Sequence, residues 1–325
     1  HDPSLLQNRC FLYHLIGNKT GEWKVPVGGM GNVARQLELT ARKYGAEILT
    51  QAAISRLDLS GKNHSVHFEA DGKLQSVEAR FLLVNFGVNI LDKILGQTYE
   101  ADATDEGSVF KINMLLHRLP KLKDAANSGT DAFSGTFHID ETYSEMQTSY
   151  RQAAQGQLPA RVPSEIYCHT LTDDSILSPE LRSKGFHTLT LFGLDTPWPL
   201  FEKSNIEMRE RAQKAFVAGL ERRLDEPLDD CLAKARDGSP CIESKSPVDI
   251  EEALGLYHGN IFQTALTFPF AETDEQAGQG GVETEHDDVY LCGASATRGG
   301  AVRGIPGPHA PRRVPGQGRW SRGNH

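Results

Sequence analysis

The sequence predicts an α/β protein in which a sheet-forming part is interrupted by a second part of α+β type. Three observations carry this prediction. A glycine-rich stretch at 26–31 leads into a helical pattern, and apolar runs at 81–84 and 289–292 have the composition of strands buried on both faces. A long segment with proline-containing loops separates these two runs. The length of 325 residues is also enough for two domains.

The first part of the chain contains one predicted helix and several short strands. Apolar residues recur at three- and four-residue spacing from Met30 to Tyr44, and Gly45 is the expected end of this helix. Turn residues at 60–63 and 71–72 separate strands. The strands are expected at residues 47–49, 54–59, 66–68 and 81–84.

The middle of the chain mixes strands and helices. Strands are expected at 109–117 and 188–193, and helices at 142–155 and 205–223. Apolar residues of the last helix, including Ala212 and Phe216, lie near one stripe among charged residues, so this stripe should face a core. The acidic, glycine-rich stretch 272–288 should form a loop before the final strand.

Composition and charge exclude several classes of protein. The net charge of −9 gives no basic surface for a phosphate backbone, so nucleic acid is not an expected partner. The longest apolar runs are far shorter than the roughly 20 residues of a membrane-spanning helix, although peripheral membrane contact stays open. Five scattered cysteines without a C-x-x-C pair indicate reduced thiols and a cytoplasmic location.

The clearest motif is the segment 289–307, a strand that runs into a loop with several glycines. Glycine lets the backbone approach a bulky ligand closely, and a helix that begins after such a loop offers free N–H donors to phosphate or a flavin ring. Composition alone leaves a cofactor-binding loop and a plain glycine-rich turn equally open. The glycines are Gly293, Gly299, Gly300, Gly304 and Gly307.

Two segments together resemble the phytoene desaturase-like FAD-dependent oxidoreductases of the amine oxidase superfamily, which include the pyridine nucleotide-disulfide oxidoreductase domain-containing type. Residues 290–307 are similar to the C-terminal flavin-contacting motif of that family. Residues 23–31, with the helix after them and residues 45–50, resemble its Pro and Gly-Gly-Met-Gly block. Further similarities keep the order of the family, at residues 110–113, 166–172 and 257–262.

The resemblance implies FAD as cofactor and a Rossmann-like FAD/NAD(P)-binding sheet with an inserted α+β substrate domain. Gly293 and Ala294 would lie by the ribityl chain and pyrophosphate, Gly28 and Gly29 near the flavin, and Ile54 beside the adenine. Four further residues would pass beside the isoalloxazine: Gly299, Gly300, Ala301 and Val302.

The sequence departs from the family pattern at both ends. The N-terminal strand–GxGxxG–helix, whose amides hold the FAD pyrophosphate, has no counterpart, so we expect an incomplete, N-terminally truncated sheet. Pro308 and Pro311 fall where the family has a helix, and an interior proline costs about 3 kcal/mol, so we expect this helix to be disrupted. The predicted segments are 1–100 and 261–310 for FAD binding, 101–260 for substrate, and 311–325 as a disordered tail.

The predicted function is hydride transfer from an apolar small-molecule substrate to FAD, with quinone, oxygen or NAD(P) left open as electron acceptor. Flavin performs this chemistry itself, so no catalytic side chain is assigned. The alternative is a non-catalytic fragment that keeps the substrate-binding half.

Other motifs carry less weight. No metal site is expected because H-x-x-x-H and C-x-x-C spacings are missing, and the adjacent side chains of Cys168 and His169 should diverge. Lys111, His258 and Asn260 receive no firm role.

Overall fold

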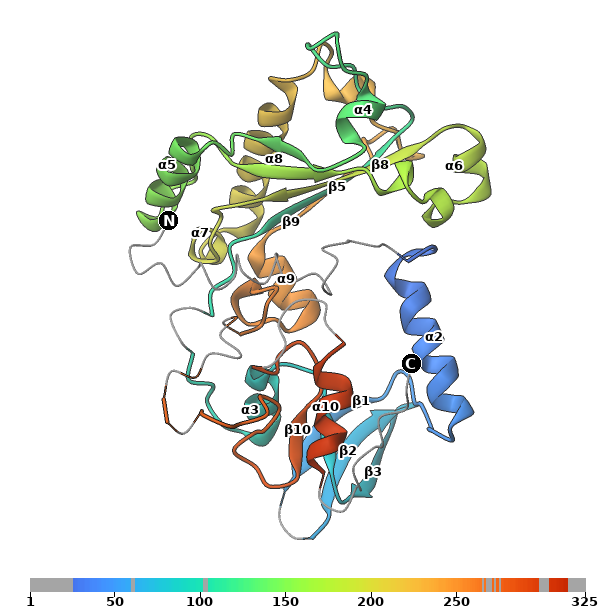
Figure 1. Cartoon of the computed structure of the whole chain (residues 1–325), viewed down its shortest axis with the longest axis vertical. Coiled ribbons are helices and arrows are strands. Elements are labelled where there is room, and N and C mark those ends of the chain that lie inside the picture. Colours follow the sequence, from blue (N-terminus) through green and yellow to red (C-terminus); the bar gives the residue numbers. More distant parts are fainter. Residues whose placement is uncertain are drawn as a thin grey trace. The chain divides into compact units, whose positions relative to one another are not determined.

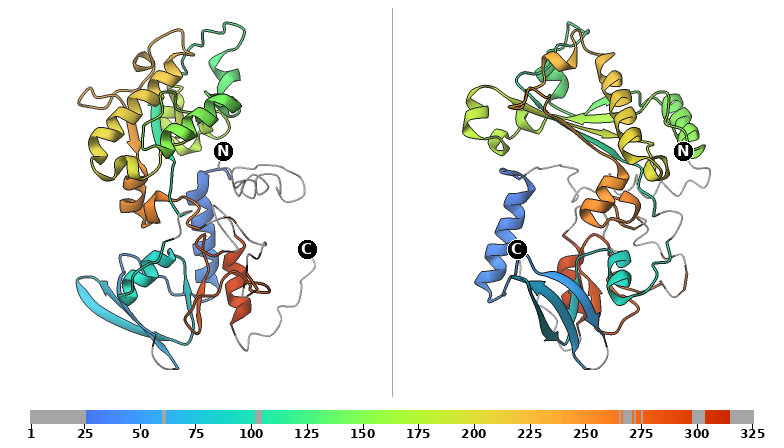
Figure 2. Two further views of the ribbon diagram at one scale, coloured as in Figure 1. Left: turned by 90° about the vertical axis from the view of Figure 1, so that its left-hand side faces the viewer. Right: turned by 180° about the vertical axis from the view of Figure 1, so that it is seen from behind.

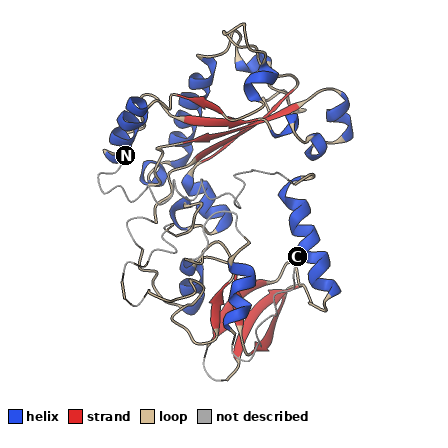
Figure 3. Ribbon diagram, in the orientation of Figure 1, coloured by secondary structure: helices blue, strands red, loops and turns tan. Residues whose placement is uncertain are grey.

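A computed structural model of the chain describes residues 26–59, 62–101, 105–264, 276–297 and 304–314, with 266, 271, 273 and 274 (Figure 1). These residues form two compact units. The described part of unit 1 is 26–46 and 107–253, and that of unit 2 comes from 47–106 and 254–314. Both contain helices and strands, so the predicted mixed α/β composition is confirmed (Figure 3).

Unit 1 is built on one antiparallel sheet of five strands in the order β6-β7-β8-β5-β9. The predicted strands 109–117 and 188–193 are present as β5 and β8. The other three strands, which are short, were not predicted from their pattern. The strands are β5 (Phe110–Leu116), β6 (Phe137–Ile139), β7 (Ser164–Tyr167), β8 (His187–Gly193) and β9 (Ile242–Lys245).

Helix α8 (Asn205–Glu221) covers one face of this sheet (Figure 2). The predicted helices 142–155 and 205–223 are present as α5 (Tyr143–Ala154) and α8. A capping box of Thr142 and Glu145 starts α5. The other α-helices among the described residues of this unit are α2 (Gly29–Lys43), α4 (Gly129–Phe133), α6 (Pro179–Ser183), α7 (Pro199–Glu202) and α9 (Pro247–Leu254).

The core of unit 1 lies between the sheet and α8. Phe110 of β5 stacks on Phe201 and on Phe216, with ring centroids 5.9 and 5.3 Å apart. The predicted apolar stripe of α8 is therefore confirmed at Ala212 and Phe216, which are fully buried. Ile206 at the start of the helix is 68% exposed and does not belong to the core.

An ion pair joins the end of β5 to the segment after α8. Arg118 donates both guanidinium N–H groups to Glu226, at 2.6 and 2.9 Å, and the backbone N–H of Lys121 donates to the same carboxylate at 2.8 Å. The Arg118 guanidinium lowers the pKa of Glu226 to about 2. This carboxylate therefore stays ionised in the folded protein well below the pH at which it titrates in an unfolded chain.

We expect the contribution of this ion pair to the free energy of unfolding of unit 1 to decrease as the pH falls from 4.5 to 2. Because the folded pKa of Glu226 lies below its ordinary value, its contribution is complete above pH 4.5 and is lost as the pH falls toward 2. At neutral pH the ion pair should contribute about 1–2 kcal/mol to the free energy of unfolding, because solvent around half-exposed Arg118 weakens the interaction. Urea denaturation of Glu226→Gln should show that loss at pH 7 and a smaller difference from wild type near pH 2. An equal deficit at both pH values would contradict the assignment.

The described residues of unit 2 form two small sheets. One is an antiparallel meander of β1 (Ala53–Asp58), β2 (His64–Ala70) and β3 (Lys73–Ala79). The other is a parallel pair, β4 (Leu82–Val84) with β10 (Val289–Leu291). Helices α3 (Val88–Leu95) and α10 (Pro306–Arg313) accompany this pair. The buried residues of its core include Val84, Leu91, Val289, Leu291 and Ala310.

Several predictions for unit 2 need correction. Residues 47–49 are not a strand. Strand β4 is not buried on both faces, because Leu83 is 45% exposed and β10 is its only partner among the described strands. The predicted loop 272–288 has no helix or strand where it is described, as expected.

The predicted disruption of the helix after Gly307 is wrong. Pro306 and Pro308 lie in the first turn of α10, where backbone N–H groups have no partner within a helix, so their rings cost no hydrogen bond. Pro311 removes one bond near the end of the helix. Ala310 is fully buried, and Arg313 donates to Glu283 at 2.6 Å, so packing and an ion pair hold α10 in place. The tail boundary predicted at residue 311 therefore falls within the last turn of α10.

None of the described helices combines the length and the apolar composition that crossing a membrane requires.

Candidate functional site

The parallel strands of unit 2 end side by side. The pairs Leu82–Val289 and Val84–Leu291 are in register, so Asn85 and Gly293 follow the two strands at the same edge. A Cβ on Gly293 would lie 1.8 Å from Oδ1 of Asn85, a separation that no side chain can adopt. A side chain at position 293 therefore fits only if the Asn85 side chain moves, and the backbone carbonyl oxygen of Asn85 at 3.2 Å leaves little further room. The carboxyl ends of parallel strands are the edge at which open α/β sheets bind nucleotides.

The chain after β4 turns directly into a helix. Gly87 is the N-cap of α3, with no side-chain hydrogen bond to the first turn and no acidic residue in that turn. Across from it, buried Ser295 donates its hydroxyl to the carbonyl of Phe86 at 3.0 Å, which ties the loop after β10 to the loop after β4. An uncapped helix start beside a glycine that permits close approach fits the phosphate and ribityl groups of a dinucleotide.

Gly28 and Gly29 begin α2 in unit 1. Their φ angles of 85° and 72° are left-handed, which favours glycine. The N–H of Gly28 donates to Oδ2 of Asp173 at 2.7 Å, and a Cβ on Gly29 would lie 3.6 Å from Ile176. Hydrogen bonds from Ser175 and then from Gly28 lower the pKa of Asp173. A carboxylate thus already accepts the N–H of Gly28 at the start of this helix.

The predicted site residues are divided between the two units. Ile54 lies in β1 opposite Phe68, next to a register shift, and is 40% exposed. Gly293 and Ala294 follow β10, and the structure brings Gly293 against Asn85, a neighbour that sequence patterns did not identify. Gly28 and Gly29 belong to unit 1. The remaining predicted residues lie outside the described part of the chain: Gly299, Gly300, Ala301 and Val302.

The face of the unit 1 sheet opposite α8, here called the open face, carries polar and aromatic side chains in two rows. The registers of the strands define both rows. The first row is His138, Glu165, Phe192, Lys111 and Lys245. The second row is Tyr167, Thr190, Asn113 and Glu243.

Several contacts fix the positions of side chains on the open face. Nζ of Lys111 lies 5.7 Å from the centre of the Phe192 ring, which itself packs edge-on against Tyr167 at 5.7 Å. Thr190 donates to Oδ1 of Asn113 at 3.4 Å. Aromatic rings beside a few hydrogen-bonding groups can hold an organic molecule and orient it.

A cavity of about 490 Å³ opens over the second row, within the usual size range of small-molecule sites. Strands β5, β8 and β9 supply most of its wall, and Ile176, the neighbour of Gly29, supplies another part. Its lining includes Asn113, Leu115, His169, Thr190 and Cys241.

The structure shows the surroundings of the residues to which the sequence assigned no role. Lys111 lies on the open face between Phe192 and Lys245. Asn260 caps a turn, because its Oδ1 accepts from the N–H of Phe262 at 3.0 Å, and His258 stacks on Tyr257. As predicted, Cys168 and His169 diverge, the first buried and the second exposed. The described cysteines are free thiols: Cys168, Cys231, Cys241 and Cys292.

Comparison with known proteins finds relatives by sequence. The chain is 45% identical to an uncharacterized protein of Mycobacterium tuberculosis over 318 residues, which are 97% of this chain and 59% of that protein. It is 24% identical to pyridine nucleotide-disulfide oxidoreductase domain-containing protein 2 of Rattus norvegicus, over 92% of this chain and 52% of that protein. The chain therefore spans between half and three-fifths of the length of these relatives. No protein-family profile matches it.

A solved structure with some similarity is a flavoprotein/dehydrogenase from Cytophaga hutchinsonii. It superposes with a TM-score of 0.33 and 13% identity, over 69% of this chain and 42% of the other.

Proposed function

We propose that this chain is part of an FAD-dependent oxidoreductase of the dehydrogenase or desaturase kind. The observation that carries the proposal is the edge of unit 2 at which β4 and β10 end, with Gly293 against Asn85 and the uncapped start of α3 beside them. The relative from Rattus norvegicus, named for a pyridine nucleotide-disulfide oxidoreductase domain, supports the same class. The phytoene desaturase-like resemblance of residues 23–31 and 290–307 supports the finer assignment.

We assign separate roles in cofactor binding and substrate binding to the residues of the chain. Bound FAD supplies hydride acceptance, which needs no acid or base from the protein. Gly293 gives the cofactor close access to the backbone, and the start of α3 offers N–H groups to a phosphate. The open face and its cavity would hold the substrate, with Phe192 and Tyr167 excluding water and Lys111 and Asn113 orienting polar atoms. The free thiols support a cytoplasmic location.

Equilibrium binding of FAD to the 325-residue chain separates this proposal from its alternative. Saturable quenching of flavin fluorescence supports a chain that carries enough of the cofactor site to bind. If the chain does not bind FAD, while protein expressed from its complete natural gene does, the chain is a non-catalytic fragment that keeps the substrate-binding half. If neither binds FAD, the flavoenzyme proposal is wrong.

A further inference from the structure

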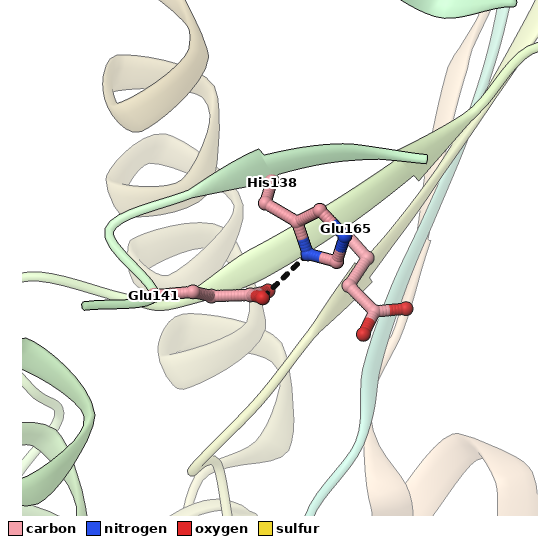
Figure 4. Close-up of side chains that lie close together, drawn as sticks. All are labelled: His138, Glu141 and Glu165. Carbon is pink, nitrogen blue, oxygen red and sulfur yellow. Dashed lines mark hydrogen bonds and ion pairs between the residues drawn. The ribbon is translucent and has the colours of Figure 1, made fainter. Parts of the chain in front are cut away.

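A histidine and two glutamates meet at one edge of the open face (Figure 4). His138 of β6 and Glu165 of β7 are directly opposite in register, so both side chains project from the same face of the sheet. Glu141 follows β6 and approaches the same ring, its Oε2 2.6 Å from Nδ1 of His138. One ligand atom from each of the three residues lies within 4.8 Å of the others.

The backbone after β6 sets the direction of Glu141. Asp140 has a left-handed φ of 55°, and its fully buried carboxylate accepts hydrogen bonds from Arg222 and, at 3.2 Å, from Arg223 of the segment around the end of α8. The Asp140 carboxylate is therefore hydrogen-bonded to the arginines, while the carboxylate of the next residue, Glu141, is hydrogen-bonded to His138 (Figure 4).

Among the described residues, no lysine or arginine forms an ion pair with Glu141 or Glu165, the two glutamates of the cluster. Oε1 of Glu141 is buried and has no hydrogen-bond partner within the described structure. Burial first, and the nearby Glu165 charge in addition, raise the pKa of Glu141, which His138 opposes. Tyr167 donates its hydroxyl to Glu165 and orients that carboxylate.

We propose that His138, Glu141 and Glu165 bind a divalent transition-metal ion, with Zn²⁺ as the preferred ion. One imidazole nitrogen and two carboxylate oxygens are ligands that Zn²⁺ accepts, whereas Ca²⁺ and Mg²⁺ select oxygen ligands alone. The orphaned Oε1 of Glu141 gains a partner in the metal ion. His138 is half-exposed, so the ion can enter from solvent and keep a water molecule as a further ligand.

Isothermal titration of Zn²⁺ into the metal-free 325-residue chain tests this site. We expect one saturable site per chain, with affinity weakened by about tenfold or more in His138→Gln and in Glu165→Gln. His117→Gln and Glu252→Gln are the matched controls, because both residues are exposed, lie in unit 1 and are outside the cluster. Their affinity should equal that of the wild type, and circular dichroism shows whether each variant is folded.

Two outcomes would contradict the site. No saturable binding by the wild type, or equal affinity in folded His138→Gln and Glu165→Gln, would overturn the site. The titration is independent of flavin, so failure of this proposal is distinct from failure of the proposed function.

Discussion

Gly293→Val is expected to weaken FAD binding by about tenfold or more, because overpacking a close approach costs about 1–3 kcal/mol and each 1.4 kcal/mol is a factor of ten. Even a Cβ at this position would lie 1.8 Å from Oδ1 and 3.2 Å from the backbone carbonyl oxygen of Asn85, so a valine displaces the Asn85 side chain and crowds the end of β4. This is the edge we assign to the ribityl chain and pyrophosphate. Flavin fluorescence titration of protein expressed from the complete natural gene measures the effect.

Two further variants separate cofactor binding from folding. Gly135→Val places the same side chain on a glycine of unit 1 with no atom near its Cβ direction, so it should leave FAD affinity unchanged. Asn85→Ala combined with Gly293→Ala removes the clash with the Asn85 side chain and should leave the protein folded, as measured by circular dichroism. If folded Gly293→Val binds FAD as tightly as the wild type, the edge formed by β4 and β10 is not the cofactor site.

Phe216→Ala is expected to lower the free energy of unfolding of unit 1 by about 3–5 kcal/mol, the usual cost of removing a buried phenylalanine. Phe216 is fully buried and stacks on Phe110, so its loss leaves a cavity between α8 and the sheet. Urea denaturation monitored by circular dichroism measures the change.

Gly193 gives a matched test of the same contact. A Cβ on Gly193 would lie 2.1 Å from Cζ of Phe216, so Gly193→Ala alone should be destabilising. In the Phe216→Ala background the added methyl group enters the cavity, and the same substitution should be neutral or stabilising. Additive effects of the two substitutions would contradict the packing described here, because residues in contact are expected to be coupled.

Long periodic segments of the fold could be predicted from sequence, and short strands could not. Helix α8 and strand β5 have patterns long enough to identify, and both are present. Strand β6 has only three residues, and its place beside β7 depends on pairing that no local pattern contains. The prediction for α10 failed because it applied the cost of an interior proline to a helix whose first turn and packing accommodate three prolines.

Within the candidate site, the sequence predicted only residues that belong to the glycine-rich motifs. Gly293 was identified from its motif, but its partner Asn85 comes from a segment about 200 residues earlier, and only the parallel register brings them together. The same holds for His138 and Glu165, which are cross-strand neighbours without a recognisable ligand spacing. Alternation along β5 and β8 could have indicated the open face, since Lys111, Asn113 and Thr190 interrupt their apolar residues.

The flavin content of the native protein tests the central claim most directly. Protein expressed from its complete natural gene and purified without denaturation should be yellow, and the chromophore released on denaturation should be FAD, close to one per chain. A preparation that is folded, colourless and unable to take up added FAD would contradict the account.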